Sequence, residues 1–300
     1  MTMATAKKIV GLGEALFDLF GDEARLGGAP LNVAVHAQQL GNHGLVVSRI
    51  GQDDYGDRLL DDLRGRDMNV DYIQHDPDLP TGQVIVRMSD SGEPDYDIVS
   101  NVAWDVLQYD YDLEDLARVA DAICFGTLAQ RNGQSRNTIY RFLETARHTI
   151  RLLDVNLRQQ YYDRRILTRS LELATAAKLN TAELRVLDEM FSLGASFDDA
   201  AFALRKKFDL QWVALTRGHE GTSVYTADEQ HTADPVVVDC SQGDAVGAGD
   251  ATSAALLHGA THRWPWQQTL TLANRLGAFV ASQRGACPPL PDDLTRLAAV

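Results

Sequence analysis

Four consecutive residues near the C-terminus, Gly247-Ala248-Gly249-Asp250, combine a small-residue backbone with a carboxylate. They precede the small-residue run 251–257, which is typical of a helix. At a helix start, a backbone without bulky side chains can bring several free N–H groups and partial positive charge to one point. Such a point suits phosphate, and a neighbouring carboxylate can accept a proton from the hydroxyl that attacks it. For an isolated Gly-x-Gly-Asp, an N-cap would be the preferred interpretation of Asp250, and the rest of the chain decides between the two.

The elements that must position this loop follow a repeated β–α order. Strands are expected at 8–13, 45–50, 70–75, 122–126, 151–156, 178–180 and 211–216, with short strands at 224–225 and 236–238. Helices are expected at 30–40, from a cap at Asp53 to Arg66, at 135–148 with Ser135 as cap, and at 167–177, 247–262 and 265–283. This order predicts one α/β domain over 1–300, with a doubly wound, mostly parallel sheet that helices cover on both faces.

A β-hairpin interrupts the alternation. Residues 83–88 and 96–99 have strand character, and 89–93 form the turn between them. Together with a strand at 16–20, the hairpin predicts a small separate sheet, from about 14–22 and 81–101, that acts as a lid over a ligand. An exposed apolar face of this sheet could also pair two chains as a homodimer.

The composition excludes some classes of partner. Lys+Arg 28 against Asp+Glu 42 gives a net charge of −14, which argues against nucleic acid but not against anionic small molecules. No segment approaches the roughly 20 apolar residues of a membrane span, so a cytoplasmic location is the expectation. The three cysteines, Cys124, Cys240 and Cys287, have no metal-ligand spacing and suggest no disulfide framework.

Two familiar nucleotide-binding motifs are incomplete or missing. Gly11-Leu12-Gly13 lacks the third glycine of the dinucleotide-binding motif and is followed by strand-like residues. The sequence contains no Gly-x-x-x-x-Gly-Lys-Ser/Thr motif, which argues against a P-loop ATPase. Glu14 and Asp18 instead place carboxylates near the end of the first strand, where open α/β sheets bind ligands.

Further candidates each have a plain structural interpretation beside the functional one. The Gly27-Gly28 turn lets the backbone approach a ligand, and Asn32 can hydrogen-bond a polyol or simply be satisfied in the first helical turn. Arg158 offers a cation at a strand end, or a surface salt bridge. Glu183 is also favoured in a first helical turn by the helix dipole.

Three motifs in this chain resemble signatures of the ribokinase (PfkB) family of sugar kinases. They are the N-terminal 27–32, Gly-Gly-Ala-Pro-Leu-Asn; the central 178–183, Lys-Leu-Asn-Thr-Ala-Glu; and the C-terminal 244–250, Asp-Ala-Val-Gly-Ala-Gly-Asp. Their order and spacing are family-like, and the resemblance covers nearly the whole chain. It implies a doubly wound α/β fold with a β lid, and ATP-dependent phosphorylation of a sugar hydroxyl.

The resemblance also implies a role for each matching residue. Asp250 matches the catalytic base, and the backbone of Gly247, Ala248 and Gly249 matches the anion hole. In the central motif beginning at Lys178, Asn180 and Glu183 match residues that organise Mg²⁺ and phosphate, largely through water. On the nucleotide side the matches are Thr216, Gly218 and Gly221, with Asn274 where the last helices border adenine. On the sugar side the candidates are Asp18, Gly27, Gly28, Asn32 and Arg158.

The sequence departs from the family pattern in two places. The approach to the C-terminal motif, through residues 240–243, is longer than usual. Ala245 stands where the family usually has Thr, so any contact of that hydroxyl with phosphate or with a monovalent cation such as K⁺ is in doubt. The catalytic base is unaffected. A catalytically weak sugar-binding or regulatory protein on the same scaffold therefore stays open beside the kinase hypothesis.

The sugar motifs favour one substrate. Ala29-Pro30 follows the Gly-Gly pair, as in many fructokinases, where ribokinases usually have Lys-Gly; segments 13–16, 125–129 and 154–158 are similar to fructokinases too. D-Fructose, converted to fructose 6-phosphate, is the leading hypothesis. A 2-keto-3-deoxygluconate kinase is the alternative, and its acid substrate would need a cation such as Arg87, Arg131 or Arg158.

Overall fold

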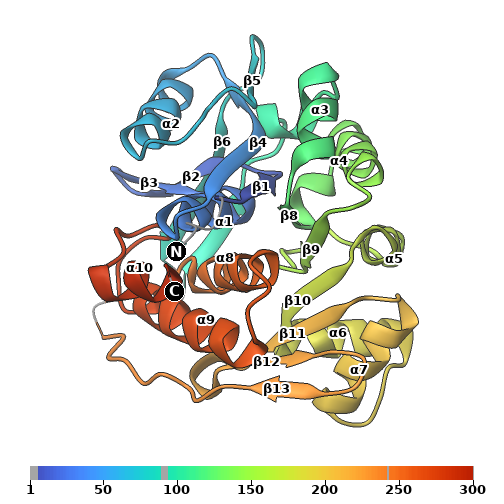
Figure 1. Ribbon diagram of the computed structural model, residues 1–300. Helices are drawn as coiled ribbons and strands as arrows, with labels where there is room; N and C mark the ends of the chain where they lie inside the picture. Colours follow the sequence, from blue (N-terminus) through green and yellow to red (C-terminus); the bar gives the residue numbers. More distant parts are fainter. Residues whose placement is uncertain (1–5, 89–93, 242, 300) are drawn as a thin grey trace.

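The large sheet of the protein has nine strands, and the computed structural model describes residues 6–88, 94–241 and 243–299. In chain order the strands are β1 (Lys8–Leu12), β4 (His43–Gly51), β5 (Ile73–Asp76), β8 (Ala122–Phe125), β9 (Ile150–Asp154), β10 (Ala176–Asn180), β11 (Trp212–Thr216), β12 (Thr222–Tyr225) and β13 (Gln230–Thr232). Their order across the sheet is β13-β12-β11-β10-β9-β8-β1-β4-β5 (Figure 1). From β5 to β11 all neighbours are parallel, whereas β12 and β13 run antiparallel at one edge.

Helices cover both faces of this sheet, as the sequence predicts. One face carries α1 (Ala29–Gln39), α2 (Asp54–Gly65), α8 (Ala248–Thr261), α9 (Trp266–Ala281) and α10 (Asp292–Ala298). The other carries α3 (Tyr111–Val119), α4 (Gly133–Thr145), α5 (Arg164–Leu173), α6 (Thr181–Phe191) and α7 (Phe197–Lys207). In β1, Ile9 packs into the first layer while Val10 and Leu12 pack into the second. A parallel strand buried on both faces is therefore apolar throughout.

The small predicted sheet is present, with one more strand than expected. Its order is β3 (Glu23–Gly27), β2 (Leu16–Phe20), β6 (Gly82–Met88), β7 (Pro94–Ile98). The antiparallel pairing of β6 with β7 confirms the hairpin, whereas its expected turn at 89–93 lies outside the described residues. The sequence interpretation omitted β3, which pairs with β2 and carries Arg25.

Several expected boundaries were wrong because a side chain caps the backbone elsewhere. Helix α4 is capped by Asn132, not by Ser135, whose hydroxyl instead donates to the Trp104 carbonyl at 2.7 Å. Helix α5 begins after its cap Asp163 and ends at Leu173, so 176–177 belong to β10 rather than to a helix. The strand expected at 70–75 starts only at Ile73, because the Asn69 side chain accepts the Asp71 N–H in a turn.

The short strand expected at 236–238 is absent from the described structure. This valine run is irregular, and Val237 is 91% exposed, because no neighbouring strand pairs with it in the described ranges. The last strand of the sheet is β13 instead. Helices α3, α7 and α10 were not predicted, and α10 adds a third helix after the two expected to close the chain.

The cap predicted at Asp53 is confirmed, since its carboxylate accepts the Gly56 N–H at 2.8 Å. Cys124 and Cys287 are buried and Cys240 is exposed, and all three thiols are free. Among the described helices, none has the length and apolar character needed to cross a membrane.

Candidate active site

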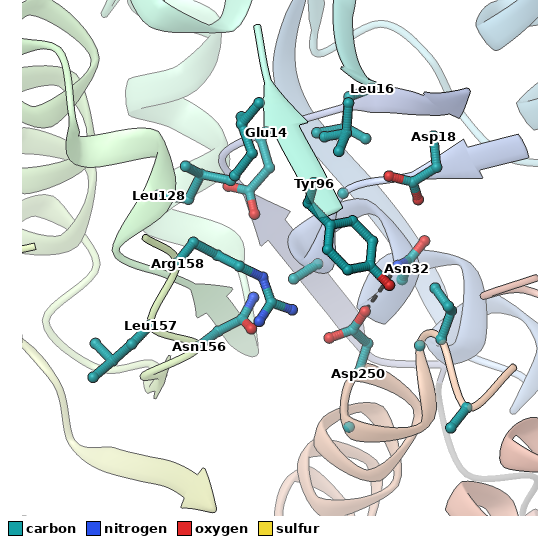
Figure 2. Close-up of a pocket in the computed structure, with 18 of the residues that line it drawn as sticks. Glu14, Leu16, Asp18, Asn32, Tyr96, Leu128, Asn156, Leu157, Arg158 and Asp250 are labelled. Atoms are coloured by element: carbon teal, nitrogen blue, oxygen red, sulfur yellow. Dashed lines mark hydrogen bonds between the residues drawn. The ribbon is translucent and has the colours of Figure 1, made fainter. Parts of the chain in front are cut away.

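A cavity of about 680 Å³ opens between the large sheet and the small sheet. It lies where β1, β9, β10 and β11 end and where α1 and α8 begin, the edge at which open α/β sheets bind ligands. Figure 2 shows side chains from the small sheet, from the loop after β9 and from α8 converging on this space. The predicted site residues that line it are Asp18, Gly28, Asn32, Arg158, Lys178, Asn180, Glu183, Thr216, Gly247, Gly249 and Asp250.

The start of α8 has the form that the sequence predicts for an anion hole. Gly247, not Asp250, is the N-cap, with φ of 78°, and a Cβ there would lie 2.6 Å from the Cα of Ala286. Asp250 is the third residue of the helix. In the part of the chain that the structure describes, the N–H groups of Gly249 and Asp250 have no hydrogen-bond partner and no side chain caps the helix. Free N–H groups at a helix start favour an anion.

The Asp250 carboxylate is held from the opposite helix. Asn32, in the first turn of α1, donates from Nδ2 to Asp250 Oδ2 at 2.8 Å, and the Cys287 thiol donates to Asn32 Oδ1 at 3.3 Å. Burial raises the pKa of Asp250 to about 7; Asp154 raises it further, while Lys178 and the Asn32 hydrogen bond oppose the shift. The group can therefore change protonation state near neutral pH.

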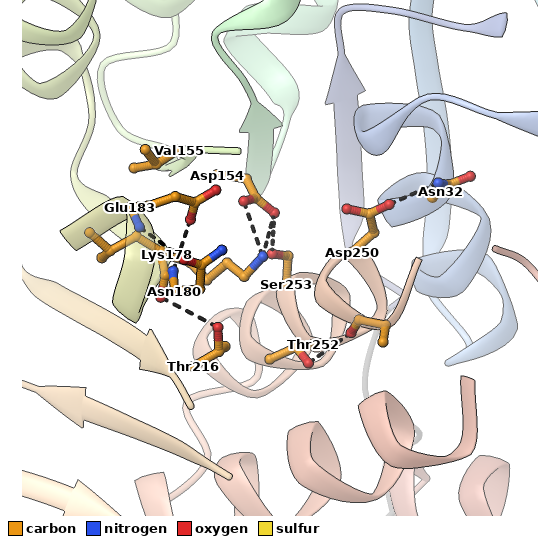
Figure 3. A network of polar contacts seen from close by, with 12 residues as sticks. Asn32, Asp154, Val155, Lys178, Asn180, Glu183, Thr216, Asp250, Thr252 and Ser253 are labelled. Carbon is orange, nitrogen blue, oxygen red and sulfur yellow. Dashed lines mark hydrogen bonds and ion pairs between the residues drawn. The ribbon is translucent and has the colours of Figure 1, made fainter. Parts of the chain in front are cut away.

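Beside the anion hole lies a buried polar network that the sequence did not predict as a unit (Figure 3). Lys178 Nζ lies 3.0 and 3.1 Å from the two oxygens of Asp154, and the Ser253 hydroxyl donates to Asp154 Oδ2 at 2.8 Å. A Cβ on Gly249 would lie 2.9 Å from Lys178 Nζ, so this ammonium is next to the helix start. Burial alone would lower the pKa of Lys178, but Asp154 outweighs it and the pKa is raised.

The motif at 180–183 forms a capping box at the start of α6. The Asn180 side chain accepts the Glu183 N–H at 2.9 Å, and Glu183 Oε2 accepts the Asn180 N–H at 2.8 Å. Glu183 Oε1 accepts the Leu157 N–H at 3.1 Å, which ties α6 to the loop after β9. Burial raises the pKa of Glu183, against the effect of Lys178. Each carboxylate oxygen keeps a lone pair that can face water in the cavity.

Acidic side chains dominate the end of the cavity beneath the small sheet. Burial raises the pKa of Glu14 to about 7 and that of Asp18 to about 6. The cation facing them is Arg158, which lowers the pKa of both groups. Arg158 is positioned by a loop in which Asn156 and Gln159 have positive φ, and Gln159 donates to the Tyr96 carbonyl in the small sheet at 2.6 Å.

A second contact joins the small sheet to the loop before α8. Arg25, on β3, lies 2.7 Å from Asp244 Oδ2, and Asp244 also accepts the N–H groups of Val246 and Gly285. Ala245, at the position where the family usually has Thr, has φ of 55°, a conformation that β-branched residues strongly disfavour.

Five predicted residues do not line the cavity. Gly27 packs under Asp18, where a Cβ would lie 2.6 Å from Asp18 Oδ2, and Ala248 packs against the apolar cluster to which α8 and α9 contribute. Asn274 donates to the carbonyls of Ala233 and Asp234 and lies against Gly221. Asn274 thus contacts Gly221, and neither of these residues nor Gly218 lines the cavity that contains Asp250.

Sequence reasoning missed Asp154, Ser253 and Tyr96 as site residues. A signal existed for two of them. Asp154 lies near the carboxyl end of one expected strand, which the structure pairs with the strand of Lys178, and Ser253 stands one helical turn after Asp250. Tyr96 lines the cavity from β7, a strand of the predicted hairpin, but no sequence signal marks this residue as part of the site (Figure 2).

Comparison with known proteins agrees with this geometry. The model of the pfkB family carbohydrate kinases matches residues 9–293. The chain belongs to this family. It is therefore a carbohydrate kinase, a phosphotransferase with an alcohol group as acceptor, and the resemblance seen in its three motifs is confirmed.

Named relatives of this carbohydrate kinase cover almost its whole length. The fructokinase of Escherichia coli is 28% identical over 95% of this chain and 96% of its own, and that of Klebsiella pneumoniae is 30% identical over 96% and 98%. A structure of fructokinase from Vibrio cholerae O395, in its fructose, ADP and calcium ion bound form, superimposes with a TM-score of 0.81 at 22% identity, covering 98% of this chain and 100% of that one. At that identity the structure supports the fold alone, the ribokinase-like fold predicted here.

Proposed function

We propose that this carbohydrate kinase phosphorylates D-fructose to fructose 6-phosphate with ATP. The observation that carries the proposal is the charge around the sugar end of the cavity. Glu14, Asp18 and Asp250 supply carboxyl groups there, and Arg158 is the one lining cation that forms no ion pair within the described residues. These carboxyl groups can accept hydrogen bonds from many hydroxyls, but they repel a substrate that carries a negative charge of its own. The sugar end of the cavity therefore favours a neutral polyol.

The sugar-acid alternative lacks its cations. Arg131 is buried, lies 2.7 Å from Asp105 and stacks 4.0 Å from the Trp104 ring. Arg87 is exposed on β6 and lies 3.5 Å from Asp97. Neither lines the cavity, so 2-keto-3-deoxygluconate would meet Arg158 alone among several carboxyl groups. The two relatives named above, the fructokinases of Escherichia coli and Klebsiella pneumoniae, support the same choice.

The geometry accounts for the transfer step. The γ-phosphoryl group of ATP is placed at the start of α8, where the free N–H groups of Gly249 and Asp250 bind its oxygens. The sugar hydroxyl oxygen attacks the phosphorus, its proton passes to the Asp250 carboxylate, and the bond from phosphorus to the leaving oxygen of ADP breaks. Asn32 keeps the carboxylate facing the hydroxyl, and Lys178 adds positive charge beside Gly249.

The acidic residues near the expected phosphate position would contact Mg²⁺ only through its bound water molecules. Among the described residues there is no cluster of three His, Cys, Asp or Glu side chains able to hold a metal ion, and both Glu183 oxygens already accept backbone N–H groups. Mg²⁺ commonly keeps several waters and binds substrate phosphates, so Asn180 and Glu183 would hold those waters. The ion would neutralise phosphate charge.

The remaining expectations complete the proposal. The small sheet acts as a lid over the sugar, and Thr216 contacts the nucleotide phosphates, with Gly218, Gly221 and Asn274 toward adenine. A requirement for K⁺ stays a prediction, which a comparison of reaction rates in K⁺ and in Na⁺ would test. A homodimer through the small sheet also stays a prediction, which sedimentation velocity would test.

ADP release with ATP and Mg²⁺, measured against fructose, ribose, tagatose, 2-keto-3-deoxygluconate and a nucleoside, tests the proposal. Fructose should have the highest kcat/KM. A preference for the keto acid would keep the mechanism at Asp250 and overturn the substrate. No transfer to any of them would favour the catalytically weak binding protein, and Ala245→Thr would then be the variant to measure.

A further inference from the structure

Glu14 is a buried carboxyl group for which the transfer step has no use. It follows β1 by two residues and is only 2% exposed, yet it belongs to the cavity wall. Within the described residues its Oε2 has no hydrogen-bond partner and the group forms no ion pair. Burying a carboxyl oxygen without a partner is costly, so such atoms are rare unless a ligand satisfies them.

The direction of the side chain gives the ligand position. In Figure 2 the Glu14 carboxyl group points from the end of β1 toward Arg158, on the other side of the cavity from the Asn32–Asp250 pair. Asp250 must meet the hydroxyl that is phosphorylated. A group held by Glu14 therefore belongs to another part of the same sugar.

The chemistry of Glu14 limits what it can bind. An ionised carboxylate only accepts hydrogen bonds, and a protonated one adds a single O–H donor. Either form pairs with a hydroxyl, whereas the carboxylate or phosphate of an anionic ligand would repel the ionised form. We propose that Glu14 is a specificity-determining residue that binds a hydroxyl of the neutral sugar remote from the phosphorylated one.

This inference rests on the proposed function, because it assumes a neutral polyol in the cavity. A purely structural role is the competing explanation. The Glu14 carboxyl group also lies near the N–H of Ala29, at the start of α1, where a helix dipole favours an anion. A structural carboxyl group would affect every substrate alike, whereas a sugar contact affects only substrates that carry the contacted hydroxyl.

A cycle of enzyme and substrate changes separates the two roles. Rates are measured for wild type and Glu14→Gln with D-fructose and with its 1-deoxy, 3-deoxy and 4-deoxy forms. The expected result is that wild type loses about 10- to 100-fold in kcat/KM on one deoxy sugar, the range for a hydrogen bond to a charged group. Glu14→Gln should show that loss with fructose itself and little further loss with the same deoxy sugar. Glu189→Gln, an exposed change of the same charge on α6, should leave every rate unchanged.

Equal losses for Glu14→Gln on fructose and on all deoxy sugars would overturn the inference and leave a structural role. If Glu14→Gln does not fold, Glu14→Asp, which withdraws the carboxyl group by one methylene, is put through the same cycle. The wild-type rate with fructose is read first. No transfer to fructose overturns the proposed function, and the cycle is then run on deoxy forms of the sugar that wild type accepts, so the two failures differ.

Discussion

Asn32 Nδ2 lies 2.8 Å from Asp250 Oδ2, and this contact joins the first turns of two helices across 218 residues of sequence. Helices α1 and α8 pack against each other on the same face of the large sheet, which brings the two turns together. The two signatures of the chain thus meet in one hydrogen bond, with the sugar side on α1 and the phosphate side on α8. In the proposed mechanism, Asn32 therefore orients the carboxylate that acts as the base and also faces the sugar.

Replacing Asp250 with Asn tests whether this carboxylate is the base. The amide cannot take the hydroxyl proton, so kcat for fructose should fall by about 10² to 10⁴ while fructose still binds. ADP release gives the rate and isothermal titration gives the binding. An unchanged kcat would show that another group accepts the proton.

The pH dependence of wild type should follow the ionisation of Asp250. Because burial raises its pKa to about 7, kcat/KM should rise with pH and level off above about pH 8. Asn32 lowers the pKa of Asp250, so Asn32→Ala should move this limb to higher pH and also raise KM. Profiles of kcat/KM between pH 5 and 9 for wild type and Asn32→Ala check both expectations. If the rise of kcat/KM moved to lower pH in Asn32→Ala, the rise could not be assigned to Asp250.

The same ionisation should cost folding stability at high pH. In the folded protein the pKa of Asp250 is about 7 against 3.8 ordinarily, so the folded state binds more protons in that window. The free energy of unfolding then falls as pH rises from about 4 to about 7. Asp250→Asn should therefore be more stable than wild type at pH 8, by roughly 1–3 kcal/mol, and nearly equal at pH 4. Urea unfolding at pH 4 and pH 8 measures this difference in the free energy of unfolding. A larger stabilisation at pH 4 than at pH 8 would contradict the raised pKa of Asp250.

The sequence predicted the edge at which the site forms, because the carboxyl ends of parallel strands share one edge. Asn32, Lys178 and Asp250 meet at this edge for that reason, whereas Asp18 reaches the cavity from β2 of the small sheet. The nucleotide-side Asn274 does not line the cavity, because on α9 it contacts Ala233, Asp234 and Gly221 instead.

Contacts between segments far apart in the sequence could not be predicted from the local sequence pattern. The valines at 236–238 have strand propensity but no partner strand among the described residues, so propensity alone misled. The pairing of Arg25 with Asp244 joins a strand that was not predicted to a loop 219 residues away. A carboxylate's partner is set by tertiary packing, which neither periodicity nor capping residues encode.

The buried pair of Lys178 and Asp154 should be important for both folding and rate. Lys178→Met leaves the Asp154 charge buried without its cation, which should cost about 3–5 kcal/mol. The double variant Lys178→Met with Asp154→Asn removes both charges and should recover much of that stability. Urea unfolding measures the two variants.

Activity of the double variant separates structure from catalysis. Since Lys178 Nζ is adjacent to Gly249 at the helix start, its loss should keep kcat low even where folding is restored. Full activity in the double variant would mean that Lys178 only neutralises Asp154. Ser253→Ala, which removes the other hydrogen bond to Asp154, should reduce stability by about 1 kcal/mol and change kcat little.

The small sheet should close over the sugar through Arg25. Its guanidinium pairs with Asp244 in the loop before α8, so the lid and the phosphate-binding loop are linked directly. Bound fructose should slow hydrogen exchange in β6 and β7, and Arg25→Gln should speed it in the free protein and raise KM for fructose about 2- to 5-fold. Arg87→Gln is the matched control, because Arg87 pairs with Asp97 within the same sheet and is exposed. Exchange that is equal with and without fructose would argue against a lid, and equal effects of both arginine variants would argue against the Arg25–Asp244 link.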